Sequence, residues 1–255
     1  MGGALVTGWR LAGAFSPSDL MVLDPQPGPA VAAAREAGAR LNPPEREFAG
    51  AATVVMAVTP QIWRAVAAEI EPHLAADAVV VSTLAGVGAA DLAEAFGGRG
   101  VARVMPTMAA AIGKGAAAVH ARDARARRHA HDLFEPLGLV VDLEDEASMH
   151  AATAVCGSAP AYLYAFIEAL GAAAAAAGLE PADAARLPRA AIIGAAALLD
   201  QTGEDAADLR RQVTSPGGTT EAALEVLLGD GGLGPLLEAA VAAAMARSRD
   251  LGAPR

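Results

Sequence analysis

The sequence of 255 residues predicts an α/β domain with a doubly wound, Rossmann-like sheet, followed by an all-helical domain. In the first part of the chain, short β-rich runs alternate with helical stretches, which is the order that builds a doubly wound sheet. After about Glu146 the strand signals stop, and every later periodic stretch is helical. We therefore expect two domains, at residues 1–147 and 148–255.

The expected strands are short, and several are apolar throughout. The runs Val54–Val58 and Val79–Val81 are typical of parallel strands that helices cover on both faces. The six expected strands span Leu20–Asp24, Thr53–Val58, Ala78–Thr83, Val101–Met105, Ala116–His120 and Leu139–Leu143. Alanine-rich stretches predict helices between them at Ala30–Ala39, Gln61–Leu74 and Ala89–Phe96.

The second half of the chain predicts helices only. Gly178 suits a helix end, and Pro181 and Pro216 suit first-turn or turn positions. The expected helices span Ala159–Ala177, Pro181–Gln201, Asp205–Gln212, Thr219–Gly229 and Gly234–Leu251. Because alanine-rich helices bury little area each, we expect an intertwined dimer to stabilise them.

Composition and charge narrow the function classes. Nineteen basic against 29 acidic residues give a net charge of −10, which argues against a nucleic-acid partner. We interpret the basic cluster as a solvated helix face; it comprises Arg122, Arg125, Arg127, Arg128, His129 and His131. No run reaches the roughly 18 apolar residues of a membrane span, so we expect no membrane segment. A single cysteine, Cys156, and the lack of a signal sequence fit the cytoplasm, and the histidines lack the spacing of a metal site.

Two small-residue segments precede expected helices. Val213–Thr220 reads VTSPGGTT, and the helix start after it offers unpaired N–H groups that suit a carboxylate or a phosphate. Its two glycines allow a ligand to approach the backbone, and Ser215, Thr219 and Thr220 add hydroxyl groups. Thr153–Tyr162 reads TAVCGSAPAY. A threonine-capped helix after a Pro-Gly turn, and close helix packing, are the structural alternatives.

Together these segments resemble the pyrroline-5-carboxylate reductase family, which ends proline biosynthesis. The family's Ser-Gly-Ser-Gly-Pro-Ala-Tyr is met by Cys156–Tyr162, and its Ser-Pro-Gly-Gly-Thr-Thr is intact at Ser215–Thr220. The resemblance covers essentially the whole chain. Further family motifs correspond to Ala57–Gln61, Ala85–Val87 and Arg103–Ala109, each at the end of an expected strand.

The sequence departs from the family pattern at several positions. Thr59 replaces a usual lysine, and Thr107-Met108-Ala109 replaces Asn-Thr-Pro. Cys156 and Ala159 also replace small family residues. These departures keep open a reductase for a different cyclic imine.

The resemblance implies NADPH- or NADH-dependent reduction of L-1-pyrroline-5-carboxylate to L-proline by a homodimer or a larger homo-oligomer. Thr220 is implied as the catalytic hydrogen-bond donor to the ring nitrogen. The residues implied to bind the substrate are Ser158, Ser215, Gly217, Gly218, Thr219 and Thr220. The residues expected to bind the cofactor are Gly2, Gly3, Asp24, Ala57, Val58, Thr59, Pro60, Ala85, Gly86, Met105, Pro106 and Thr107. An acidic residue such as Asp24, at the end of a strand, can hold the ribose hydroxyls of NAD.

The start of the sequence departs most from the family. The family opens with an apolar strand and Gly-x-Gly-Asn-Met-Gly-Gly-Ala, whereas this sequence begins Met1-Gly2-Gly3-Ala4 inside that motif. Gly2 matches the third glycine of the dinucleotide motif, and the first strand and first two glycines are missing. The loss of a central strand would leave two inner sheet edges unpaired. We therefore expect an N-terminally truncated sequence whose own reductase activity is doubtful; an inactive or pseudo-enzyme helical dimer is the alternative.

Overall fold

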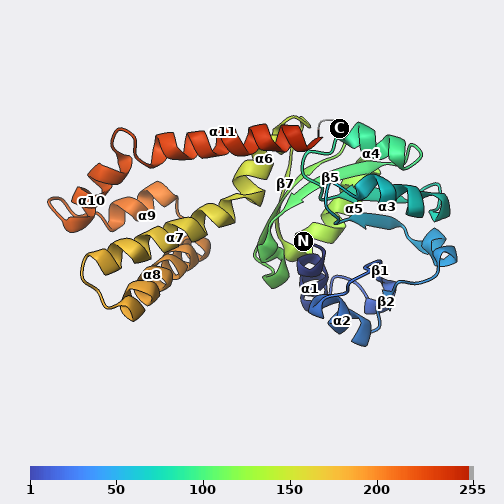
Figure 1. Ribbon diagram of the computed structural model, residues 1–255, viewed down its shortest axis with the longest axis horizontal. Coiled ribbons are helices and arrows are strands. Elements are labelled where there is room, and N and C mark those ends of the chain that lie inside the picture. Colours follow the sequence, from blue (N-terminus) through green and yellow to red (C-terminus); the bar gives the residue numbers. More distant parts are fainter. Residues whose placement is uncertain (253–255) are drawn as a thin grey trace. The chain divides into compact units, whose positions relative to one another are not determined.

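The structure is a computed structural model that describes residues 1–252, and it divides into two compact units (Figure 1). The α/β unit comprises Met1–Gly157 and the chain from Ala243 onward, and the helical unit comprises Ser158–Ala242. The domain boundary at residues 147/148 stays a prediction.

The main sheet of the α/β unit has five strands in the order β3-β4-β5-β6-β7. They are β3 (Thr53–Met56), β4 (Val79–Ser82), β5 (Val101–Pro106), β6 (Gly115–His120) and β7 (Gly138–Asp142). Strands β3, β4 and β5 are parallel, whereas β6 pairs antiparallel with β5. The connection at residues 107–114 is too short for the crossover that a parallel pair needs.

A second, two-stranded parallel sheet is formed by β1 (Met21–Val22) and β2 (Arg40–Leu41). Both β1 and β3 have a free edge, since no strand within residues 1–252 pairs with their outer sides. Val22 and Val55 nevertheless pack against the same hydrophobic cluster.

Helices cover both faces of the main sheet, which confirms the predicted doubly wound α/β class. One face packs against α1 (Gly2–Ala12), α2 (Pro29–Glu36) and α5 (Ala124–Phe134). The other face packs against α3 (Trp63–Ile70) and α4 (Ala89–Ala95). Strand β4 shows why: Val79 and Val81 join the first cluster and Val80 the second, because successive side chains point to opposite faces.

Short helical turns complete the α/β unit. Helix α6 (Ser148–Ala152) continues into a π-helical turn at Thr153–Gly157. The 3₁₀ turns are Pro17–Asp19, Glu45–Gly50, Glu71–His73, Met108–Ile112 and Glu135–Leu137.

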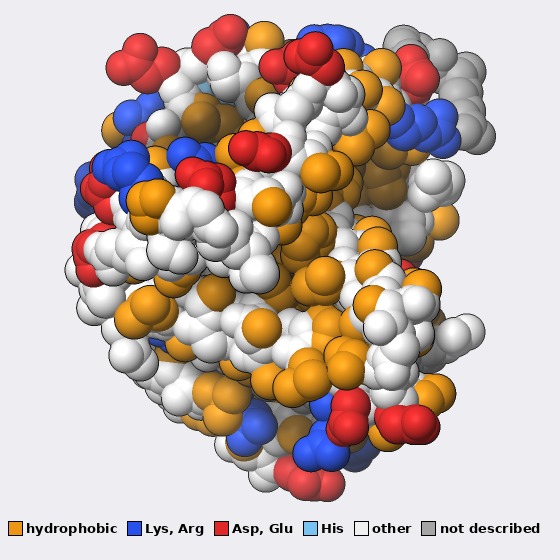
Figure 2. Space-filling model, turned by 90° about the vertical axis from the view of Figure 1, so that its left-hand side faces the viewer, with side chains coloured by type: hydrophobic (Ala, Val, Ile, Leu, Met, Phe, Trp, Pro, Cys, Tyr) orange, Lys and Arg blue, Asp and Glu red, His pale blue; other side chains and the backbone are white. Residues whose placement is uncertain are grey.

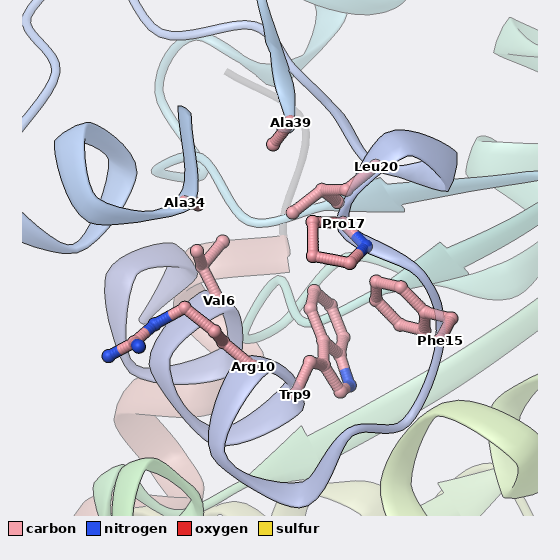
Figure 3. A pocket seen from close by; sticks show the side chains of 8 residues that line it. All are labelled: Val6, Trp9, Arg10, Phe15, Pro17, Leu20, Ala34 and Ala39. Atoms are coloured by element: carbon pink, nitrogen blue, oxygen red, sulfur yellow. The ribbon is translucent and has the colours of Figure 1, made fainter. Parts of the chain in front are cut away.

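A small apolar cavity lies where α1 packs on the β1–α2 region (Figure 3). The rings of Trp9 and Phe15 lie side by side in it, with centroids 5.6 Å apart, while the guanidinium of Arg10 points away. Its volume of about 20 Å³ has room for no more than a water molecule. The cavity is therefore part of the packing and not a ligand site.

The helical unit consists of α7 (Ala159–Ala176), α8 (Pro181–Thr202), α9 (Ala206–Gln212), α10 (Thr219–Leu228) and the first half of α11 (Leu233–Gly252). No residue of α7, α9 or α10 is buried. Large apolar side chains are exposed instead, among them Leu163, Tyr164, Ile193, Leu198, Val226 and Leu236. Figure 2 shows apolar side chains running across the face that turns toward the viewer, which leaves a wide surface for a partner.

One helical stretch meets a length and composition test for membrane spans. Residues 148–176 form 29 helical residues, and an 18-residue window within them has a mean hydropathy of 1.3, with none of that window buried. Helices α10 and α11 would pass the same test only as a pair bent by 43°. A helix from a subunit interface passes such a test too, because it is equally apolar. The expectation of no membrane segment stays a prediction.

The basic cluster lies on or just before α5, and three of its members contact acidic side chains. Arg125 pairs with Asp77 at 3.0 Å, and Arg127 lies 3.8 Å from Asp142. His131 contacts both Glu135 and Asp142. The interpretation of the whole cluster as a solvated helix face stays a prediction.

Candidate active site

The turn before α10 exposes its backbone as the sequence predicts. Gly217 has a φ of +68°, a left-handed conformation that favours glycine. A Cβ on Gly218 would lie 2.5 Å from Ser215 Oγ and 2.9 Å from Ser215 O, so a side chain there would clash with Ser215. Gly218 is the N-cap of α10 and receives no side-chain cap. The Gly218 N–H donates to Ser215 O at 3.0 Å within the turn. An anion at this helix N-terminus would therefore meet the first turn of α10, which begins at Thr219 and where the helix dipole favours negative charge.

Glu221 already interacts with this turn. Its Oε2 accepts a hydrogen bond from Gly217 N–H at 2.7 Å. Glu221 lies three residues after the N-cap, which is the spacing of a capping box. Glu221 is not among the site residues expected from the sequence, although this spacing predicts its contact with the turn. Its carboxylate occupies a donor that a substrate carboxylate would also use.

The second small-residue segment is divided between the two units. Cys156 belongs to the α/β unit, where its Sγ donates to Met105 O and Ala116 O, both at 3.4 Å. Burial raises the pKa of the Cys156 thiol, which keeps it protonated and unreactive at neutral pH. Ser158 belongs to the helical unit and forms the N-cap of α7, with Pro160 in the first turn.

The expected cofactor residues gather at the carboxyl ends of the parallel strands. Ala57–Pro60 follow β3, Ala85 and Gly86 follow β4, and Met105 and Pro106 end β5, with Thr107 next. Thr83, in the loop after β4, donates from both N–H and Oγ1 to Met56 O, at 3.0 and 3.1 Å. Open α/β sheets bind their ligands at this edge.

The first turn of α1 also lies at this edge. A Cβ on Gly2 would be 3.5 Å from Ala57 Cβ, so the start of α1 adjoins the residue that follows β3. The α1 N-terminus has no side-chain cap and no acidic residue in its first turn. Gly2 and Gly3 thus offer a bare helix N-terminus to a phosphate.

Asp24, two residues beyond β1, is held by its neighbours. Its Oδ1 accepts from Gln26 N–H at 2.8 Å, and its backbone exchanges two 2.9 Å hydrogen bonds with the side chain of Asn42. Asn42 adopts a positive φ of 45°. The Asp24 carboxylate is thus fixed in a tight turn, with its second oxygen available for a ribose hydroxyl.

Thr107 is nearly buried and makes more hydrogen bonds within the protein than we expect of a residue that contacts the cofactor. It is only 9% exposed, its N–H donates to Ala116 O at 2.9 Å, and its Oγ1 accepts from Ala116 N–H at 3.1 Å. The Thr107 hydroxyl therefore already uses one of its two acceptor positions within the protein. Thr59, at the position of the family's lysine, is exposed.

The site residues predicted from sequence form two groups in the structure. The cofactor group lies in the α/β unit and the substrate group lies in the helical unit. Their assembly into one site is part of the proposal below. Within residues 1–252, no group of three or more His, Cys, Asp or Glu side chains is arranged to hold a metal ion.

Two family models match the chain. One, described as pyrroline-5-carboxylate reductase dimerisation, matches residues 146–251. The other, described as NADP oxidoreductase coenzyme F420-dependent, matches residues 1–86. The first therefore covers the helical half, including the exposed apolar helices and the α10 turn.

Curated relatives and solved structures agree with these matches. A pyrroline-5-carboxylate reductase from Pseudomonas aeruginosa is 38% identical over 208 residues, covering 80% of this chain and 76% of that protein. The Escherichia coli enzyme of that name is 32% identical over 243 residues, covering 94% and 90%.

Among solved structures, a pyrroline-5-carboxylate reductase from Coxiella burnetii superposes with a TM-score of 0.87 at 29% identity, covering 98% of this chain and 94% of that one. A pyrroline carboxylate reductase from Plasmodium falciparum, solved with NADP bound, has a TM-score of 0.83 at 25% identity and covers 99% and 95%. With its motifs, fold and relatives in agreement, the chain belongs to the pyrroline-5-carboxylate reductase family.

Proposed function

We propose that this protein reduces L-1-pyrroline-5-carboxylate to L-proline with NADPH or NADH. The observation that carries the proposal is the exposed Ser215–Thr220 turn at the start of α10, in a chain whose α/β unit presents a ligand-binding sheet edge. Relatives that are 38% and 32% identical to this chain bear the name of this activity. Proline biosynthesis is the corresponding role.

The α/β unit fits a nicotinamide dinucleotide. The uncapped first turn of α1, with Gly2 and Gly3, would hold the pyrophosphate, and Asp24 would hold the adenosine ribose. The loops after β3, β4 and β5 would enclose the nicotinamide end; they contribute Ala57, Val58, Thr59, Pro60, Ala85, Gly86, Met105, Pro106 and Thr107. When bound, the reduced cofactor supplies a hydride.

The helical unit holds the substrate in this proposal. Its carboxylate sits at the helix N-terminus formed by Gly217, Gly218 and Thr219, while Ser158 and Ser215 line the pocket. The Thr220 hydroxyl donates to the ring nitrogen, where electron density rises as hydride reaches the adjacent carbon. Donors that are already oriented toward developing charge lower the barrier without reorganisation.

A homodimer, or a larger homo-oligomer built from dimers, completes the site. The exposed apolar side chains of α7, α8 and α10 need a partner surface, and the dimerisation family model spans all three helices. A second subunit would cover these helices and close the pocket around the α10 turn. We place the enzyme in the cytoplasm, with neither nucleic acid nor a membrane as a partner.

Oxidation of NADPH and NADH by the purified chain, with and without pyrroline-5-carboxylate, tests the function. We expect imine-dependent oxidation and proline as the product. A six-membered cyclic imine in the same assay tests the alternative substrate. Nucleotide binding without turnover of either imine would contradict the proposal.

The second protein in this assay is an extended variant of the chain, in which an apolar strand and a Gly-x-Gly turn are fused before Met1. If only this protein binds nucleotide, the free edges of β1 and β3 limit the 255-residue chain. If neither binds nucleotide, the assignment of the cofactor residues is wrong.

A further inference from the structure

The loop after β4 is in direct backbone contact with the end of the last helix. Gly86 has a φ of +82°, and a Cβ there would lie 2.6 Å from Ser248 O and 2.7 Å from Gly252 N. The contact is reciprocal, because a Cβ on Gly252 would overlap Gly86 O. The last turn of α11 therefore rests on the Gly86 loop (residues 83–88), and neither glycine has room for a side chain.

A second contact ties α11 to α6. Ser248 is only 2% exposed, and its Oγ lies 3.0 Å from His150 Nδ1. Burial, reinforced by the charges of Arg103 and Arg249 and opposed by Glu146, lowers the pKa of His150. The imidazole is thus neutral at pH 7 and can share a proton with the serine hydroxyl.

A third contact reaches the other end of the Gly86 loop. Glu146, just before α6, accepts from Ala89 N–H at 2.6 Å and from Arg103 Nη1 at 2.9 Å. Ala89 is the first residue of α4 and directly follows the loop. We define the clasp as the four residues Glu146, His150, Ser248 and Gly252. The clasp contacts Gly86 within the loop and Ala89 directly after it.

We propose that the clasp is a positioning device for the nicotinamide cofactor. The clasp fixes the backbone of the Gly86 loop in the conformation that binds the nucleotide, and its members act through the loop without touching the ligand. The inference rests on the proposed function, because the contact of Ala85 and Gly86 with the cofactor is part of that proposal. Nucleotide affinity then depends on α6 and α11, which lie outside the strand–helix repeats that form the sheet edge.

The test compares the same substitution at the two ends of α11. In Gly252→Ala the new Cβ meets Gly86 O, whereas in Gly234→Ala it meets nothing within 4 Å. We expect Gly252→Ala to raise the KM for NADPH about tenfold, which corresponds to ~1.4 kcal/mol. kcat at saturating nucleotide and the KM for the imine should stay within about twofold, and Gly234→Ala should match the wild type. A purely structural role for the contact would lower kcat and Tm together without a selective change in the nucleotide KM.

Ser248→Ala is a milder second variant that removes one hydroxyl and adds no atom. Amide hydrogen exchange without nucleotide should be faster at residues 84–89 in both clasp variants and unchanged in Gly234→Ala. Faster exchange with an unchanged nucleotide KM, or unchanged exchange in both clasp variants, would overturn the inference.

Titration of NADPH binding to the wild type and both variants separates this inference from the proposed function. If the wild type binds NADPH but turns over no imine, the proposed function fails, while weaker binding by Gly252→Ala still supports the clasp. A wild-type protein that binds no NADPH would overturn the clasp as a cofactor device.

Discussion

Arg103 and Glu146 form an ion pair that is largely withdrawn from solvent, with Nη1 2.9 Å from Oε1. The Arg103 side chain is 4% exposed and the Glu146 side chain 24%. The pair connects β5 to the segment that leads into α6. It is also one of the contacts by which the α/β unit shapes its ligand-binding edge.

We expect Glu146→Gln to lower the free energy of unfolding by about 2 kcal/mol near neutral pH, because it leaves a buried guanidinium without a counter-charge. Burial alone would raise the pKa of Glu146, but the hydrogen bonds from Ala89 and Arg103 and the charge of Arg103 lower it overall. A lowered pKa means that the stabilisation is complete above the unfolded-state value and is lost as the pH falls through the folded-state value.

The difference between Glu146→Gln and the wild type should therefore be largest at about pH 7 and shrink below about pH 4. Urea unfolding across this range measures it. Glu144→Gln, nearby in the sequence, serves as a control for the loss of one charge. A constant difference at all pH values would contradict the ion pair as the cause.

Thr220 should be essential for the chemical step. Thr220→Val keeps the shape of the side chain but removes the proposed donor, so we expect kcat/KM for the imine to fall about 100-fold. Thr220→Ser retains the hydroxyl and should recover most of the activity. If Val and Ser variants were equally active, the donor role would be wrong.

Glu221 should weaken substrate binding in the wild type. Its carboxylate accepts from Gly217 N–H at 2.7 Å and repels a second carboxylate at the α10 N-terminus. We expect Glu221→Gln to lower the KM for pyrroline-5-carboxylate about two- to fivefold, the size of a charge–dipole effect at a helix end. Glu225→Gln, one turn further along α10, removes the same charge away from the turn and should leave KM unchanged. A higher KM in Glu221→Gln would show that Glu221 assists the substrate.

Asp24 should set the preference between the two nicotinamide cofactors. Asp24→Asn keeps an oxygen that can accept from Gln26 N–H, as Oδ1 does at 2.8 Å, but removes the negative charge. Because a carboxylate repels a ribose 2′-phosphate, we expect the ratio of kcat/KM for NADPH to that for NADH to rise about tenfold. Asp19→Asn provides the charge-matched control. An unchanged ratio would place the ribose elsewhere.

His131 should stabilise the fold mainly at low pH. The hydrogen bond to Glu135 raises the pKa of His131 most, burial opposes it, and Asp142 raises it further. A raised pKa means that the stabilisation is present below the unfolded-state value and is lost as the pH rises through the folded-state value. His131→Gln should cost up to about 1 kcal/mol at about pH 5.5 and little at about pH 9, because the group is partly exposed. Chemical unfolding at the two pH values measures this loss of stability. An equal loss at both pH values would rule out the charge of His131 as the cause.

The sequence predicted an element correctly where neighbouring residues alone determine its structure. The apolar run Val79–Val81 predicts a strand covered on both faces, since each face needs an apolar side chain, and Val79, Val80 and Val81 are all nearly unexposed. The Ser-Pro-Gly-Gly-Thr-Thr turn predicts an open helix start, because proline restricts φ and glycine permits the positive φ that Gly217 adopts. The predicted helices of the second half correspond to α7–α11, apart from differences at their ends.

Other elements depend on partners that no local pattern records. Helix α1 contains Gly2, Gly3 and Gly8, which are poor helix formers. It forms nevertheless, because Leu5 and Trp9 are buried in the hydrophobic cluster on one face of the sheet. Strand β2 has only Arg40 and Leu41, too few to show a period, and it exists because β1 pairs with it. The antiparallel direction of β6 follows from the short connection after β5, which the apolar pattern of the strands does not report.

The sequence by itself therefore determined the fold class and the family, and it supplied the residues of the proposed site. The tertiary structure alone decided the contacts between distant residues: Gly86 with Gly252, Glu146 with Arg103 and Ala89, and His150 with Ser248. Backbone contacts and buried hydrogen bonds of this kind depend on how whole elements pack. Periodicity and spacing are set by neighbours along the chain, so they carry no information about such partners.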